Sequence, residues 1–148
     1  MRIETKIITA LTAVLLGAGV ASAGPIPEKP KSVHLSARVF SATEVAYGLR
    51  NDNEEDVVVG IMSCSYSTNW STDNSSVTIV SPISCDKNFC STKRLKKKEM
   101  LSGMLTFALQ PHTKVPLSFR LLFKGCTDSM GRGNVTETVK SNRTDLMK

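Results

Sequence analysis

The four cysteines of this chain, Cys64, Cys85, Cys90 and Cys126, are the residues whose chemistry is most easily assigned. An even number of cysteines in a chain that leaves the cytoplasm is most simply explained by two disulfide bonds, and four cysteines allow three pairings. Zinc is a weaker alternative, because only two of them lie close together and no paired ligand motif is present. Free thiols are the remaining alternative. We therefore expect disulfides and no metal or other cofactor.

Export is predicted by residues 1–23. A positively charged start precedes an apolar run from Ile7 to Val20, and Ala21-Ser22-Ala23 offers the small residues that a signal peptidase requires. The run is shorter than the roughly 20 residues of a comfortable membrane span, although an uncleaved signal anchor is an alternative. We expect cleavage before Gly24, a periplasmic or extracellular location, and no transmembrane segment after cleavage.

A basic run covers residues 93–98. Its cations could bind phosphate, sulfate or an anionic lipid by charge alone. The plainer interpretation is a solvated hairpin turn whose lysines protect a strand edge from aggregation. No aromatic residue is interleaved with the run, so we expect no specific recognition of nucleic acid. The candidate anion-binding residues are Lys93, Arg94, Lys96, Lys97 and Lys98.

Tyr66, Asn69 and Trp70 lie in a polar, serine-rich loop. Aromatic residues in a loop can anchor a binding partner. They can equally cover the open end of a small β domain, where a single tryptophan usually packs internally. The sequence leaves both interpretations open for this candidate contact loop.

Catalytic and metal-binding arrangements are weakly indicated. His34 and His112 are the only histidines, and neither lies in a motif that would join a base to a nucleophile. Carboxylates gather in residues 52–56, which we call the acidic loop, but the spacing is not that of an EF-hand, and a solvated turn is the plainer interpretation. We expect a protein that is not an enzyme; a cryptic enzyme or a metal carrier is an unfavoured alternative.

The dominant sequence period downstream is two, which is typical of β-strands. Turn residues such as Asn51-Asp52-Asn53 separate the alternating runs. We divide the chain into the signal peptide, a Pro-rich linker at 24–31, a β-sandwich domain at 32–140 and a polar tail at 141–148. Seven or eight antiparallel strands are expected, at 33–39, 45–50, 57–64, 77–79, 101–107, 117–123 and 135–139, with one more at 91–95.

Several of these segments resemble small exported bacterial proteins of unknown function that look like immunoglobulin-like β-sandwiches. The resemblance covers roughly residues 40–140 and rests on Tyr47-Gly48-Leu49-Arg50-Asn51, residues 57–66, Trp70, Cys85-Asp86-Lys87-Asn88, residues 116–123 and Asn134-Val135-Thr136. It implies a single immunoglobulin-like sandwich, with Cys64 bonded to Cys85 and Cys90 bonded to Cys126. It carries no activity and no catalytic residues. This chain departs from the resemblance at Lys96-Lys97-Lys98-Glu99, where the pattern of those proteins would lead us to expect a Pro-Gly turn.

These observations favour an exported, non-enzymatic protein that binds another protein or an envelope component through loops or strand edges. The alternative is a polyanion-binding module that uses the basic run. Asn-X-Ser/Thr sequons begin at Asn69, Asn74, Asn134 and Asn142. They would mark glycosylated surface in a eukaryote and nothing in a bacterium.

Overall fold

The computed structural model describes residues 30–81 and 87–147. The signal peptide, most of the Pro-rich linker and Cys85 lie outside the described residues. The described chain is all-β. Its elements are β1 His34–Val39, β2 Glu44–Arg50, β3 Val57–Met62, the single 3-10 turn η1 Tyr66–Thr68, β4 Trp70–Thr72, β5 Val77–Val80, β6 Cys90–Leu95, β7 Met100–Leu109, β8 Leu117–Phe123 and β9 Val139–Leu146.

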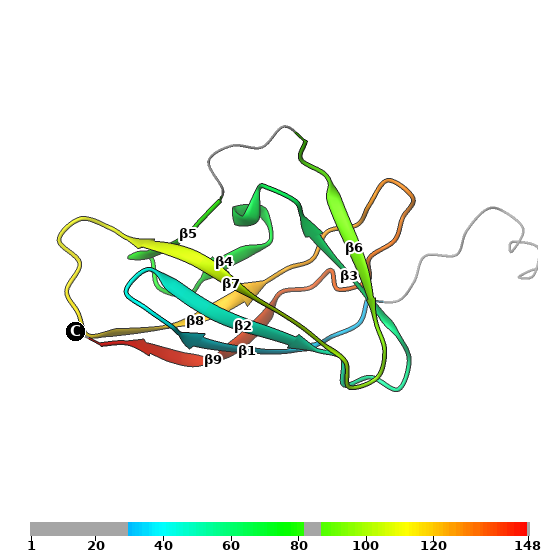
Figure 1. The fold of residues 1–148 in the computed structure, drawn as a ribbon, viewed down its shortest axis with the longest axis horizontal. Helices are drawn as coiled ribbons and strands as arrows, with labels where there is room; N and C mark the ends of the chain where they lie inside the picture. The colour runs from blue at the N-terminus through cyan, green and yellow to red at the C-terminus, as the bar shows by residue number, and fades with distance from the viewer. Residues whose placement is uncertain (1–29, 82–86, 148) are drawn as a thin grey trace, which may run out of the picture.

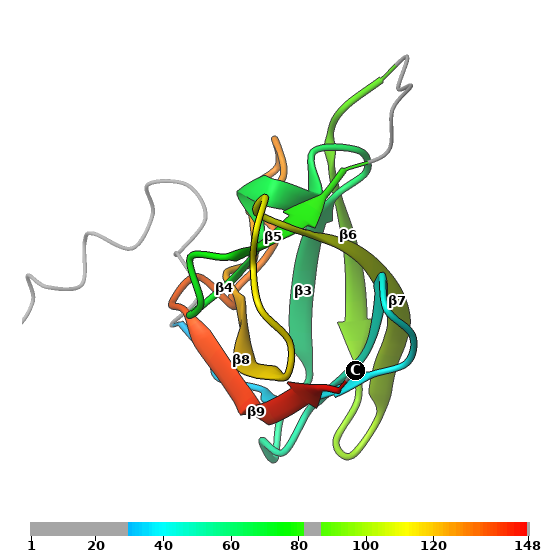
Figure 2. The same ribbon diagram turned by 90° about the vertical axis from the view of Figure 1, so that its left-hand side faces the viewer.

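The strands form three antiparallel sheets, which is consistent with a β-sandwich. One sheet has the order β1-β2-β7-β5, a second has the order β4-β8-β9, and β3 and β6 form a two-stranded ribbon. Figure 1 shows the ribbon standing across one end of the longer strands, and Figure 2 shows β8 and β9 on one side and β6 and β7 on the other. The core lies between them.

The alternating sequence produces this core directly. In β8, Phe119, Leu121 and Phe123 are fully buried, while the residues between them are more exposed. Strand β7 alternates in the same way, with Leu105 and Phe107 buried. Burial of such side chains stabilises a fold by about 1.5–3 kcal/mol each, so the period-two segments dictate which face of each strand turns inward.

Strand β3 is buried on both faces, as its unbroken apolar run indicates. The main-chain N–H of Val58 donates to Asn134 Oδ1 at 3.0 Å, and Cys126 N–H donates to the Gly60 carbonyl at 3.0 Å. This side of β3 therefore contacts the segment after β8, while its other side pairs with β6. A Cβ at Gly60 would lie 2.1 Å from the Cys126 carbonyl oxygen, so the close approach requires glycine.

Strands β1 and β9 lie side by side, and side chains of β9 take the place of a backbone ladder (Figure 1). Asn142 Oδ1 accepts the Ala37 N–H at 3.0 Å, and Asn142 Nδ2 donates to the Ala37 carbonyl at 2.9 Å. Thr144 Oγ1 accepts the Val39 N–H at 3.0 Å. We call this junction the sealed flank.

The expectation of a polar tail at 141–148 is wrong, because β9 occupies most of these residues. Residues 141–146 belong to β9, and Ser141, Thr144 and Leu146 are buried in it. The alternation was missed because two of its three inward positions are polar. Strand β4 was also not expected, since it has only three residues, and the last strand begins at Val139 rather than at 135.

The Cys90–Cys126 disulfide is confirmed. It ties the start of β6 to the segment that follows β8. Cys64 is also disulfide-bonded. Its predicted partner, Cys85, lies outside the described residues, so the Cys64–Cys85 pairing stays a prediction. A disulfide is compatible with the oxidising compartment expected for an exported chain.

Candidate partner-binding edge

Strand β6 pairs with β3 and with no other described strand. On β3, the backbone groups of Val58 and Gly60 point away from β6, because they bond to the segment after β8. In an antiparallel pair, opposed residues turn their backbone groups either toward each other or both away. Arg94 lies opposite Val58, and Thr92 lies opposite Gly60. The N–H and C=O groups of Thr92 and Arg94 therefore point outward, along an unpaired strand edge.

Strand β7 presents a second such edge toward the same space. It pairs with β2 from Met100 to Thr106, but with β5 only from Thr106 to Leu109. Phe107 N–H donates to the Thr43 carbonyl beside β2, so the odd-numbered residues of β7 face β2. The backbone groups of Ser102 and Met104 consequently point away from β2 and meet no described strand.

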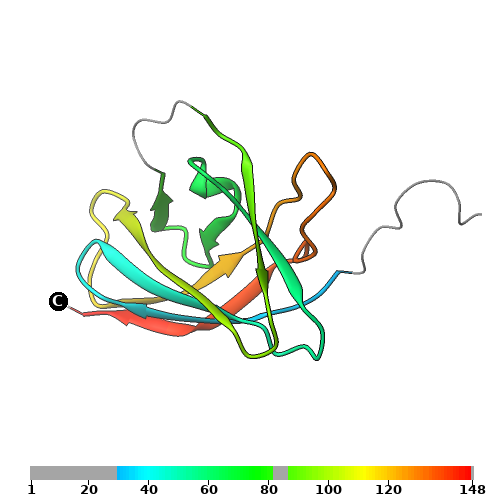
Figure 3. The same cartoon turned by 45° about the vertical axis from the view of Figure 1, so that its right-hand side comes forward.

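The two edges diverge from the turn at residues 96–99, as Figures 1 and 3 show. A hollow of about 360 Å³ lies between them. Its walls are mostly apolar, and its lining includes Tyr47, Val59, Ile61, Tyr66, Leu101 and Lys93. We call the edges of β6 and β7 and this hollow the open flank. Its volume falls within the range of about 300–1,000 Å³ that is typical of ligand pockets.

Aromatic side chains support the inner wall of the hollow. Tyr47 packs on Trp70 with ring centroids 4.4 Å apart, and Trp70 packs on Phe123 at 4.5 Å. Burial raises the pKa of the Tyr47 phenol, and the nearby phenol of Tyr66 raises it further. The Tyr47 hydroxyl offers a neutral polar group in a mostly apolar surface.

The contact-loop candidates separate in the structure. Tyr66 begins η1 and lines the hollow. Trp70 is 2% exposed and Asn69 is 4% exposed, so neither presents a surface to a partner. The Asn69 amide instead joins two segments: its Oδ1 accepts the Met62 N–H at 2.7 Å, and its Nδ2 donates to the Lys124 carbonyl at 2.9 Å.

The basic run and the acidic loop, which lie apart in the sequence, meet in the structure. Lys97 pairs with Glu54 at 2.8 Å, Arg94 with Asp56 at 3.8 Å and Lys98 with Asp52 at 3.8 Å. These pairs are exposed, so each contributes little stability, but they offset the positive charge of the run. The polyanion-binding hypothesis is not tested by this geometry and stays a prediction.

Lys93 differs from these residues of the basic run. It lines the hollow, and it has no ion pair with any residue in the described ranges. The structure thus brings together one candidate from the basic run, Lys93, and one from the contact loop, Tyr66. The feature that sequence reasoning missed is Phe89, which is 56% exposed at the end of the hollow beside β6. An aromatic residue next to a predicted strand was the available signal.

Two other hollows are less suited to binding. One lies beside the disulfide and is lined by Met62, Cys90, Asp128 and Arg132, among others. There Arg132 Nε donates to Asp128 Oδ2 at 2.8 Å, and the backbone N–H of Arg132 lowers the pKa of the Asp128 carboxyl. The charges of this hollow are thus already paired with each other.

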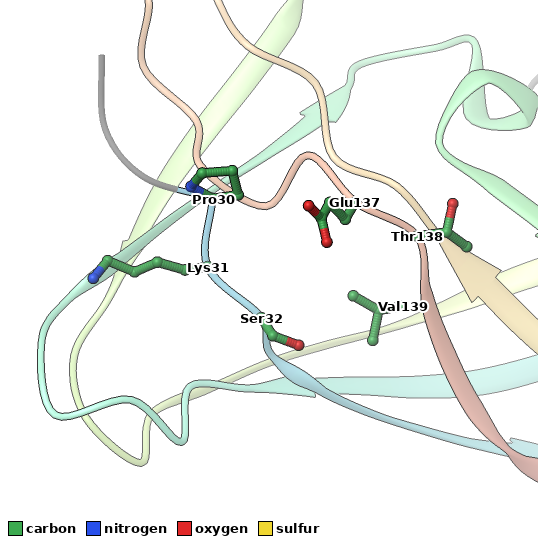
Figure 4. Close-up of a pocket in the computed structure, with 6 residues that line it drawn as sticks. All are labelled: Pro30, Lys31, Ser32, Glu137, Thr138 and Val139. Carbon is green, nitrogen blue, oxygen red and sulfur yellow. The ribbon is translucent and has the colours of Figure 1, made fainter. Parts of the chain in front are cut away.

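The other hollow is only about 140 Å³ and lies where the described chain begins. Figure 4 shows Lys31 pointing away from Glu137, and Lys31 pairs with Glu55 at 2.7 Å. Its volume is below the range that is typical of ligand pockets.

The histidines lie on the surface of the described fold, His34 in β1 and His112 in the turn before β8. Within residues 30–81 and 87–147, no three His, Cys, Asp or Glu side chains are grouped so that they could hold a metal ion. Those residues also contain no helix of sufficient length and hydrophobicity to cross a membrane.

Comparisons with protein-family models, with curated proteins and with solved structures find no match for this chain.

Proposed function

We propose that this protein is an exported, non-enzymatic binding protein with an immunoglobulin-like fold, and that it binds another polypeptide as an added strand along β6. The observation that carries the proposal is the open flank. The outward N–H and C=O groups of Thr92 and Arg94 form an edge that no described strand pairs with, beside a mostly apolar hollow. An exposed edge of this kind is a template for pairing with another chain.

The strand order supports the immunoglobulin-like part of the proposal. In such sandwiches the first, second, fifth and fourth strands form one sheet, and the third, sixth and seventh form the other. The orders β1-β2-β7-β5 and β4-β8-β9 fit this scheme if β4 takes the third position and the two strands of the ribbon, β3 and β6, are additional. The tryptophan of β4 packs between Tyr47 of β2 and Phe123 of β8, the strands that a disulfide joins in antibody domains.

The additional strand β6 explains why no described strand pairs with the edge. Strand β6 lies between the fourth and fifth positions of the scheme and pairs only with β3. It thus extends the fold, and no other described strand covers its outer edge. Natural proteins usually protect such edges, and Lys93 and Arg94 on β6 are the type of charged residue that discourages pairing with a similar chain. The same charges attract a partner of opposite charge.

A proline scan of β6 tests the proposal. Thr92→Pro removes an outward N–H and leaves the pairing with β3 intact, because proline is tolerated at the solvent side of an edge strand. We expect partners captured by the oxidised protein, and then purified, to bind this variant at least tenfold more weakly by calorimetry. Thr92→Ala, which keeps the N–H, is the matched control and should bind like the unmodified protein.

Two outcomes would overturn the proposal. One is binding of the purified partner to Thr92→Pro with unchanged affinity. The other is turnover of a substrate that a single substitution abolishes, since that would make the protein an enzyme. Lys93→Pro should behave differently from Thr92→Pro: it removes an N–H that faces Val59 of β3, so it should lower the melting temperature.

A further inference from the structure

The hollow of the open flank restricts which strand can bind there, provided that strand addition at β6, the proposed function, is correct. Side chains of an added strand alternate between the two faces of the sheet. Those on the face of Ser91 and Lys93 would enter the hollow, because the β3 residues opposite these two, Ile61 and Val59, line it as well. The hollow therefore receives every second side chain of the bound strand.

The position opposite Ser91 favours a large apolar side chain. Ser91 lies across from Ile61, and Phe89, Tyr66 and Ile61 all line the hollow at this level. Serine leaves space where a larger residue would fill the hollow. Phe89, 56% exposed, has a large apolar surface that a partner could cover, and buried aromatic contacts dominate the energetics of many interfaces.

The position opposite Lys93 favours a carboxylate. Lys93 lies across from Val59 at the rim and has no ion pair within the described ranges. Opposite charges directly across a strand pair are favourable, and like charges are unfavourable. The net charge of the chain is +6, so a second copy would approach against a repulsive field, whereas an acidic partner would be attracted.

We propose that the strand bound at β6 belongs to an acidic partner protein and carries a large apolar side chain opposite Ser91 and a carboxylate opposite Lys93. These two side chains are two positions apart and face the same way. The backbone edge provides the binding mode, and the hollow and Lys93 provide the selectivity.

Synthetic peptides test this selectivity. The probe is a short, end-blocked, threonine-rich peptide with phenylalanine and glutamate two positions apart. Three matched peptides replace glutamate by lysine, replace phenylalanine by alanine, or place the two residues side by side. Calorimetry with the oxidised protein should give the probe roughly three- to tenfold tighter binding than the lysine peptide and at least tenfold tighter binding than the alanine peptide.

A charge reversal makes the test specific to Lys93. Lys93→Glu should invert the preference, so that the lysine peptide binds more tightly than the probe. Lys96→Glu, which changes the same charge away from the hollow, is the control and should leave the order of the peptides unchanged.

The failures of the two proposals are distinguishable. If Thr92→Pro weakens all four peptides but Lys93→Glu leaves their order unchanged, strand addition stands and the selectivity inference is wrong. If the probe binds Thr92→Pro as well as it binds the unmodified protein, strand addition at β6 is wrong. No binding of the probe at millimolar concentration, or a dimer that Thr92→Pro dissociates, also overturns the inference.

Discussion

The two flanks of this fold differ in what lies against the outward backbone groups of their strands. At the sealed flank, β1 and β9 lie side by side, and the side chains of Asn142 and Thr144 bond to the backbone groups of Ala37 and to the N–H of Val39. At the open flank, β6 and β7 diverge, and their facing backbone groups meet no described strand. The comparison shows that two strands of a small sandwich can be joined by a few polar side chains, and that no described side chains join β6 to β7 in this way.

The largest expected effect concerns the disulfide that holds β6 in place. Cys90 and Cys126 are separated by 36 residues, so removing their bond in the double variant Cys90→Ser/Cys126→Ser should cost about 3–4 kcal/mol of unfolding free energy. Urea denaturation under oxidising conditions measures this change. An unchanged free energy would mean that pairing with β3 alone fixes β6.

The sealed flank should be less costly to break. Thr144→Val keeps the shape of a buried side chain but leaves the Val39 N–H without its acceptor, so we expect a loss of about 1–3 kcal/mol. Thr136→Val, at a β-branched position outside the flank, is a matched control and should change the unfolding free energy less. An equal loss in both variants would mean that the bridge from β9 does not seal the flank.

Acid should weaken the outer side of β9 through Asp73. The backbone N–H of Arg120, followed by the charge and hydrogen bond of Arg143 on β9, lowers the pKa of the Asp73 carboxyl. A lowered pKa in the folded state contributes stability above the unfolded pKa of about 3.9, and this is lost as the pH falls through the folded value. The unfolding free energy of Asp73→Asn should therefore fall less than that of the unmodified protein on acidification below about pH 4.

The control for this acid dependence is Asp145→Asn, which changes an exposed carboxylate of the same strand. Its profile below about pH 4 should follow that of the unmodified protein. If both variants lose the acid dependence equally, Asp73 has no particular role in holding β9.

The smallest expected effect is at the turn from which the open flank diverges. Lys98 has a φ of 68°, a left-handed conformation that costs a residue with a Cβ roughly 1–2 kcal/mol. Lys98→Gly should therefore stabilise the fold by about 0.5–1 kcal/mol, despite the loss of a weak, exposed ion pair with Asp52. Lys97→Gly, at a position without positive φ, should instead destabilise it; thermal denaturation of both variants measures the contrast.

Sequence patterns predicted the part of the fold that depends on burial. The period-two runs placed β1, β2, β7 and β8, and the unbroken apolar run placed β3, because apolar faces must turn inward wherever the strand lies. They did not predict β9, because Asn142 and Thr144 are polar and stabilise the fold through hydrogen bonds to β1. They also could not show that Asn69 and Asn134, at 4% and 1% exposure, are internal residues.

The candidate site was predicted only in pieces. Tyr66 and Lys93 were each singled out by residue type, but 27 positions of chain separate them in the sequence, and only the packing of η1 beside the β3–β6 ribbon brings them to one hollow. The basic run and the acidic loop were likewise considered separately, although Lys97 and Glu54 form an ion pair. Residue types indicate which groups could interact, and tertiary contacts decide which do.

The sequence by itself predicted an all-β chain that forms disulfides and buries one face of its alternating strands, because alternation and cysteine number are local or countable properties. Only the tertiary structure decided which strands are neighbours, and hence that β1 is covered by β9 while no described strand covers the outer edge of β6. The physical reason is that a strand's backbone groups are the same in every sequence. Whether they are satisfied depends on what lies beside them in space.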